Sequence, residues 1–142
     1  MLVAKAKETM RLRPSLTFDD IQKIVAAAKN EASRYGLSPT IAIVDHAGVL
    51  LYLERPDTHT PLAIDMSTGK ARTAAFRERP SSALEERVKE RPGFLTMPGM
   101  IAARGGVPLV WKNEYVGGIG ISGIAEFDEI VAKAGAAALD ES

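Results

Sequence analysis

The chain has 142 residues, of which 46% are hydrophobic and 25% are charged, and 18 basic and 18 acidic side chains give a formal net charge of zero. This composition predicts one soluble globular domain without the basic field that binding to nucleic acid or a membrane surface requires. The lack of cysteine excludes disulfides, thiolate catalysis and cysteine-bound metals. No apolar run is long enough for a membrane span, and the N-terminus lacks a secretory signal, so we expect a cytoplasmic protein.

The first half of the chain predicts an arm, a helix and a hairpin. Residues 1–16 are polar, which indicates an N-terminal arm before a single domain over 17–142. Thr17 and Asp20 form a variant of the capping box, and the apolar residues after them recur at helical spacing as far as Gly36. Strand-forming residues flank the turn at 45–48, which predicts a β-hairpin within 40–57.

The second half predicts two helices, a second hairpin and a closing helix. Thr60 as N-cap and Pro61 as first helical residue start a helix that runs to Arg77. Ser82 and Glu85 form a capping box for a short helix to about residue 89. An ordered loop over 91–106, with a short strand near 100–103, leads to a hairpin of strands 107–111 and 115–122. A helix over 125–139 closes the chain. The order α-ββ-αα-ββ-α predicts an α+β fold with a mostly antiparallel sheet.

The segment 118–123 reads Gly-Ile-Gly-Ile-Ser-Gly, a literal G-x-G-x-x-G. A dinucleotide-binding motif follows a strand and opens a helix, and a second parallel strand comes next. Here the motif lies within a predicted strand, and no strand pattern follows the closing helix, so we expect no dinucleotide site. Gly117, Gly118, Gly120 and Gly123 instead predict a bare surface on the sheet, which a helix, a second subunit or a planar ligand would cover.

Polar residues that could carry chemistry gather at 54–61 and 67–77. Lys70 and Thr73 lie one turn apart on one helix face, which is either solvated surface or part of a site. His46 lies in a hairpin turn, where we expect it to be exposed. His59 follows Asp57 just before a helix, and the two could form an acid–base pair. No third ligand cluster supports a conventional metal site, but a single histidine suffices as an axial ligand of haem iron.

Four stretches together resemble one family, namely 41–57, 69–77, 104–123 and 126–139. They are similar to the GlcG/HbpS family, also called the haem-degrading or DUF336 domain, which occurs too as the C-terminal domain of PduO-type proteins. The resemblance covers residues 17–140. It implies a profilin-like sheet of about five strands with helices on it, and homo-oligomers from dimer to octamer. Where the family usually reads Arg-Met-Asp-Gly-Ala, this chain has Arg55-Pro56-Asp57-Thr58-His59, so the loop beside the expected pocket is altered.

Three functions follow from the residues and the resemblance together. The first is a binding protein for haem or another small planar ligand, accessory to redox sensing or small-metabolite catabolism, with His59 as a candidate iron ligand. The second is an enzyme on a small metabolite, with Asp57, His59 and Lys70 in proton transfer and the Gly105-Gly106 amides holding an oxyanion. The third is an oligomeric assembly factor without a ligand. The candidate ligand-binding residues are Arg55, Asp57, His59, Lys70, Thr73, Arg104, Gly105, Gly106, Gly118 and Gly120.

Overall fold

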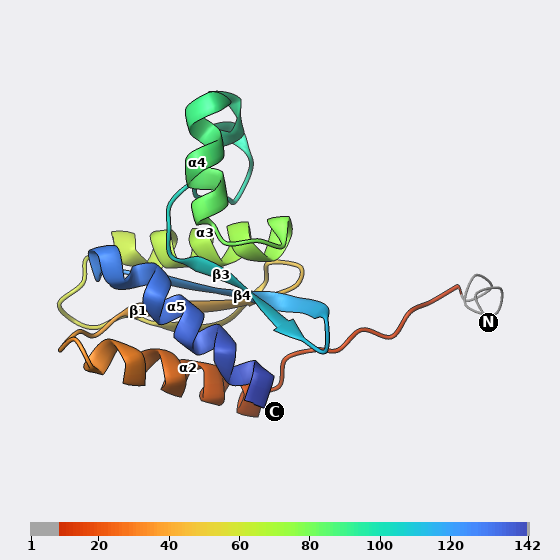
Figure 1. Cartoon of the computed structure of the whole chain (residues 1–142), viewed down its shortest axis with the longest axis horizontal. Helices are drawn as coiled ribbons and strands as arrows, with labels where there is room; N and C mark the ends of the chain where they lie inside the picture. Colours follow the sequence, from red (N-terminus) through yellow and green to blue (C-terminus); the bar gives the residue numbers. More distant parts are fainter. Residues whose placement is uncertain (1–8, 142) are drawn as a thin grey trace.

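The computed structural model describes residues 9–141 and has four strands and four α-helices within them (Figure 1). The helices are α2 (Phe18–Ser33), α3 (Leu62–Arg77), α4 (Ser82–Glu90) and α5 (Asp128–Ala137). The strands are β1 (Thr40–Asp45), β2 (Leu50–Glu54), β3 (Gly106–Trp111) and β4 (Glu114–Ser122). Short 3-10 turns η1 (Pro92–Thr96), η2 (Ala125–Phe127) and η3 (Ala138–Glu141) complete the order. The predicted order α-ββ-αα-ββ-α is confirmed.

The sheet is antiparallel throughout and its strand order is β2-β1-β4-β3. It has four strands among the described residues, one fewer than the resemblance implied. Lys112 and Asn113 both have positive φ, 47° and 66°, which is the backbone of a type I′ turn and matches the right-handed twist of the β3–β4 hairpin. Two central strands, β1 and β4, are buried on both faces, so they are apolar or glycine-rich along their length.

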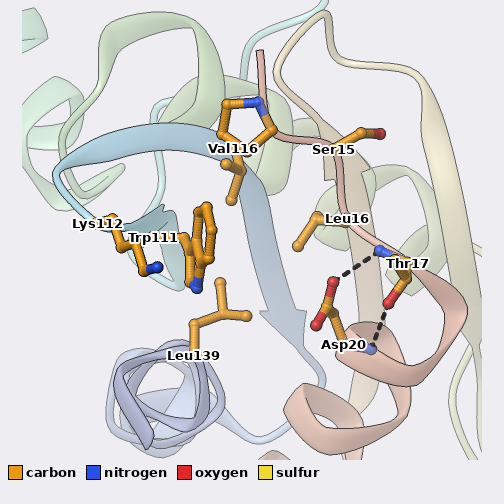
Figure 2. Close-up of a pocket in the computed structure, with 9 residues that line it drawn as sticks. Ser15, Leu16, Thr17, Asp20, Trp111, Lys112, Val116 and Leu139 are labelled. Carbon is orange, nitrogen blue, oxygen red and sulfur yellow. Dashed lines mark hydrogen bonds between the residues drawn. The ribbon is translucent and has the colours of Figure 1, made fainter. Parts of the chain in front are cut away.

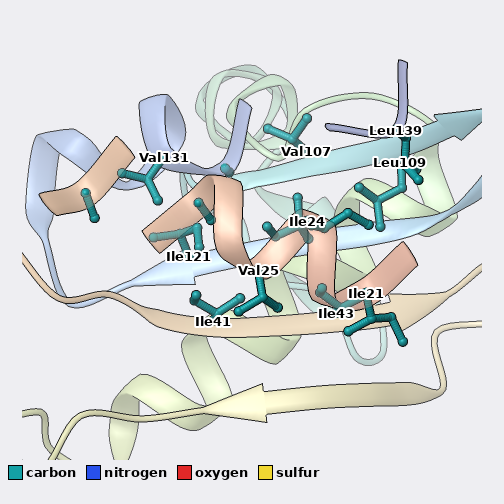
Figure 3. Packing of buried hydrophobic residues seen from close by; sticks show 14 of the residues in the cluster. Ile21, Ile24, Val25, Ile41, Ile43, Val107, Leu109, Ile121, Val131 and Leu139 are labelled. Carbon is teal, nitrogen blue, oxygen red and sulfur yellow. The ribbon is translucent and has the colours of Figure 1, made fainter. Parts of the chain in front are cut away.

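Helices cover both faces of the sheet (Figure 1). Helices α2 and α5 pack on one face, where the large hydrophobic core lies (Figure 3). Alternate residues of β1 and β4, such as Ile41, Ile43, Ile119 and Ile121, point into that core, as the period of two in a strand requires. Helix α3 packs on the opposite face, and α4 projects away from the body of the molecule.

The first helix begins as its sequence predicts. The Thr17 side chain accepts a hydrogen bond from the Asp20 backbone N–H at 3.2 Å, and Asp20 accepts from the Thr17 N–H at 2.8 Å. This reciprocal capping box satisfies two of the backbone donors that a helix N-terminus leaves without a partner.

The glycines of β3 and β4 let α3 approach the sheet at backbone distance. A Cβ atom added at Gly106, Gly118 or Gly120 would collide with backbone carbonyl oxygens of α3, those of Lys70, Ala71 and Ser67 respectively. The sequence left open whether a helix, a second subunit or a planar ligand covers these glycines. At Gly106, Gly118 and Gly120 it is helix α3.

Three local predictions are wrong. No strand forms near 100–103, because the loop there is held by Thr73, whose hydroxyl accepts from the Ile101 N–H at 2.8 Å. The Ser82 hydroxyl makes no capping box and donates instead to Glu129 at 2.8 Å. The cap residue of α3 is Pro61 without a side-chain hydrogen bond, rather than Thr60.

The arm predicted over 1–16 is described from residue 9, and residues 1–8 lie outside the described part. From Thr9 to Leu16 the chain forms neither helix nor strand. Arg13 donates to the Tyr115 carbonyl at 2.9 Å, and Leu16 packs against the core. The arm thus joins the β3–β4 hairpin before α2 begins. Among residues 9–141, no helix is long and apolar enough to cross a membrane.

Substitution of Gly120 by alanine tests the close packing of α3. The added methyl group would overlap the Ser67 carbonyl and force the helix away from the sheet, so we expect the free energy of unfolding to fall by about 3 kcal/mol. Urea denaturation measures the change. Gly93→Ala is the matched control, because a Cβ there meets no atom within 4 Å. Equal stability of both variants would contradict this account of the glycine strand.

Candidate functional site

Two of the polar residues singled out in the sequence, His59 and Lys70, lie at one end of the sheet, where β4 ends, β1 begins and β3 begins. Thr40 and Ser122 are paired in the β1–β4 register there, and both are buried. Helix α3 crosses this end, and the N-terminus of α5 follows β4 after a short turn. Side chains from regions far apart in sequence therefore meet at this edge.

Lys70 is the centre of this cluster and is only 4% exposed. Its Nζ donates to the Ile121 carbonyl at 3.0 Å and to Asp128 Oδ2 at 3.0 Å. Gly105, with φ of +127°, leaves room for the side chain, since a Cβ there would lie 3.1 Å from Lys70 Cδ. Lys70 is thus a buried and paired cation that ties α3 to β4 and α5. The sequence left open whether Lys70 lies on a solvated helix face, and its burial excludes that alternative.

Asp128 is the partner that sequence reasoning missed. It is the first residue of α5, and its Oδ1 accepts from the Ile124 N–H at 3.1 Å. Burial raises the pKa of this carboxyl above its ordinary value, and the charges of Lys70 and His59 together with its hydrogen bonds offset part of that rise. The only sequence signal was an acidic residue in a first helical turn, which is too common to mark a site.

His59 lies at the half-buried edge of the same cluster. Its Nδ1 is 2.7 Å from Thr40 Oγ1, and Arg55 donates to its backbone carbonyl. The imidazole lies against Gly123, where φ is +90° and any Cβ would collide with the ring. When Nδ1 donates to Thr40, the Nε2 lone pair is left for an external ligand.

A hollow of about 580 Å³ lies between α2 and the segments 37–39 and 54–56, and neither His59 nor Thr40 lines it. Pro39, Arg55 and Pro56 are in its wall, and these residues flank Thr40 and His59 along the chain. Lys29 also lines it but is paired with Glu54 at 2.9 Å. Arg55 is therefore the basic side chain in this wall that can meet a ligand carboxylate.

The other predicted residues hold the structure rather than open onto this edge. Thr73 is fully buried and binds the 101 loop through its hydroxyl. The Gly106 N–H donates to Ser81 Oγ at 2.7 Å and is not free to hold an oxyanion. Arg104 lies 3.6 Å from Glu85 and 3.8 Å from Glu129.

The remaining predicted residues divide between surface and core. Asp57 is exposed, and His46 is exposed in its hairpin turn as predicted. Gly118 and Gly120 are buried beneath α3. Among residues 9–141, no group of three or more histidine, aspartate or glutamate side chains is arranged to hold a metal ion.

Comparison with known proteins identifies the family of the chain. A family model described as haem degrading protein HbpS-like matches residues 16–137. Protein GlcG of Escherichia coli strain K12 is 39% identical over 114 residues, which make up 80% of this chain and 85% of that protein. The chain therefore belongs to the HbpS-like family, as its motifs predicted.

Solved structures share the fold. HbpS of Streptomyces reticuli, solved as a double mutant, is 33% identical, with a TM-score of 0.84 over 92% of this chain and 90% of that one. A complex named PduOC:Heme is 24% identical, with a TM-score of 0.78 over 89% of this chain and 96% of that one. At that identity the second likeness shows the fold alone.

Replacement of Lys70 by methionine tests the buried ion pair. It leaves the Asp128 carboxylate buried without its cation, which should cost about 3–5 kcal/mol of the free energy of unfolding. A carboxyl whose pKa is raised by folding stabilises the fold at low pH, and this stabilisation is lost as pH rises through the raised pKa. Without Lys70 that pKa rises further, so the loss of this stabilisation should extend to higher pH.

Urea denaturation across a pH series measures both effects. Lys89→Met, at an exposed position on α4, is the control and should leave stability and its pH dependence unchanged. The assignment is contradicted if Lys70→Met matches this control.

Proposed function

We propose that this protein binds haem or a related planar tetrapyrrole at the edge formed by His59, Thr40 and Arg55. The observation that carries the proposal is the half-buried imidazole of His59, held at Nδ1 by Thr40 with Nε2 left for a ligand. Iron in a bound haem would take such a nitrogen as an axial ligand. Membership of the HbpS-like family and the haem named with the PduOC relative support the same ligand class.

One residue in contact with His59 also lines a hollow. Arg55 donates to the His59 carbonyl and is in the wall of the hollow of about 580 Å³ beside α2, a volume within the size range of small-ligand sites. Its wall contains Leu37 and Pro39 for apolar contact and Arg55 for a carboxylate. The Thr40 hydroxyl already holds the imidazole in one orientation. Ligand binding therefore costs little further side-chain entropy. We further propose that the protein, with its ligand bound, is accessory to redox sensing or to small-metabolite catabolism.

Catalysis on a small metabolite is the second candidate, favoured by the closeness of His59 to the Lys70–Asp128 pair. The pairing of Lys70 removes it from proton transfer, so His59 would act as the general base with its orientation set by Thr40. This candidate requires turnover that is lost in His59→Ala and retained in a variant of exposed Asp57.

Assembly into a homo-oligomer is also proposed, on the apolar surface of the edge strand β2. Leu51 and Leu53 are 39% and 36% exposed. Leu53 pairs with Ala42, which packs toward α3, so Leu53 lies on the α3 face of the sheet. An edge strand with exposed apolar residues is a surface on which a second copy can pair.

Haemin titration tests the main proposal. The native protein should show a shifted Soret band, and His59→Ala should lose it because the axial nitrogen is gone. His46→Ala is the matched control, since it removes the other histidine of the chain at an exposed turn. Haem binding is disproved if the native protein gives no spectral change, and His59 is not the ligand if its variant behaves like the control.

Light scattering tests the assembly. The native protein should have more than one subunit, and Leu51→Lys with Leu53→Lys should reduce the particle to a monomer by placing unpaired charges in the contact. Leu95→Lys, at a 63% exposed leucine of η1, should leave the mass unchanged. A monomeric native protein would rule out the assembly, and an unaltered oligomer in the double variant would place the contact elsewhere.

A further inference from the structure

A second hollow of about 580 Å³ lies at the opposite end of β4 from His59. It is enclosed by the β3–β4 hairpin, the start of α2 and the last turn of the chain (Figure 2). Strand β4 separates the two regions by its nine residues, about 25 Å of extended chain. The hollow is therefore independent of the polar cluster and of the function proposed for it.

The walls are apolar with one aromatic side. Figure 2 shows Trp111 and Lys112 on one side and Leu16, Thr17 and Asp20 on the other. Val116 and Leu139 complete the apolar lining. An indole beside aliphatic side chains suits a flat ring system, because stacking on the indole adds to the burial of apolar area.

The charged residues at the rim determine which sign of charge on a ligand is favoured. Lys112 Nζ lies 4.5 Å from the centre of the Trp111 ring, and among residues 9–140 no carboxylate lies within ion-pair distance of it. Asp20 is the opposing charge in the wall, but its carboxylate accepts from the Thr17 N–H at 2.8 Å and lies at the positive end of α2. The free charge at the rim is therefore positive.

Part of this hollow is built from residues outside the range that the family model matches. The family match covers residues 16–137, whereas Pro14 and Ser15 come before it and Leu139 comes after it. The arm supplies one wall because Arg13 fastens it to the Tyr115 carbonyl at 2.9 Å. The hollow thus includes residues on both sides of the part that the family model matches.

We propose that this hollow binds a small planar, apolar molecule that carries an acidic group, with the ring against Trp111 and the acid facing Lys112. The class is that of aromatic carboxylates and sulfonates. The hydrophobic walls supply most of the affinity, and the ammonium group of Lys112 discriminates between an acid and its uncharged analogue.

Two fluorescent probes that differ by one acidic group test this site. They are 8-anilinonaphthalene-1-sulfonate and uncharged N-phenyl-1-naphthylamine. Trp111 is the only tryptophan of the chain, so energy transfer from it to either dye reports binding near this wall. We expect saturable transfer with both dyes. Lys112→Gln should weaken the sulfonate about three- to fivefold, the contribution of a partly exposed ion pair, and leave the uncharged dye unchanged.

Three further variants make the result specific. Lys112→Arg keeps the charge and should bind the sulfonate like the native protein. Lys89→Gln removes an exposed lysine of the projecting α4, and His59→Ala alters the proposed haem site, so neither should change the affinity for either dye. The proposal is overturned by an absence of saturable transfer, by an equal loss of both dyes in Lys112→Gln, or by an equal loss of the sulfonate in Lys89→Gln.

Discussion

The close approach of α3 to the glycine residues of β3 and β4 is the constraint on which the rest of the structure depends. Carbonyl oxygens of Ser67, Lys70 and Ala71 occupy the positions that Cβ atoms would take on the strands. Glycine normally weakens a strand. Its repeated use here implies that the close packing of α3 stabilises the fold by more than the glycines destabilise the strands. Because α3 lies at backbone distance, small residues such as Ala71 and Ala75 pack between it and the sheet, and the longer side chain of Lys70 reaches the end of β4.

Lys70 makes use of that closeness. Its ammonium group meets both the Ile121 carbonyl and Asp128, so one side chain joins the two helical layers around the end of the sheet. A buried pair of this kind adds little net stability over apolar packing, but it penalises any arrangement in which one partner lacks the other. It therefore fixes the position of the α5 N-terminus and, through the turn at Gly123, the surface against which His59 lies.

The sequence predicts best those features that depend on neighbouring residues alone. The capping box of Thr17 and Asp20 is such a feature, and so is the order of helices and hairpins. The strand expected near 100–103 fails because the Thr73 hydroxyl, 28 residues away in sequence, takes the Ile101 N–H. Asp128 could not be predicted as a member of the cluster for the same reason, since its role depends on the ion pair with Lys70, 58 residues away. What covers the glycine face is likewise decided by tertiary contact, which no local pattern contains.

The two ends of β4 differ in chemistry because they differ in what covers them. At the Ser122 end, α3 and α5 close over the strand, so the charges of Lys70 and Asp128 are buried and paired, and His59 lies half-buried at the edge. At the Glu114 end the arm lies beside the β3–β4 hairpin, with Trp111 next to a hollow and Lys112 without an ion-pair partner among residues 9–140. Iron coordination therefore suits the first end, whereas stacking with an ion pair suits the second. The same glycine strand that brings α3 so close thus lies between the site proposed for haem and the site proposed for an acidic ring.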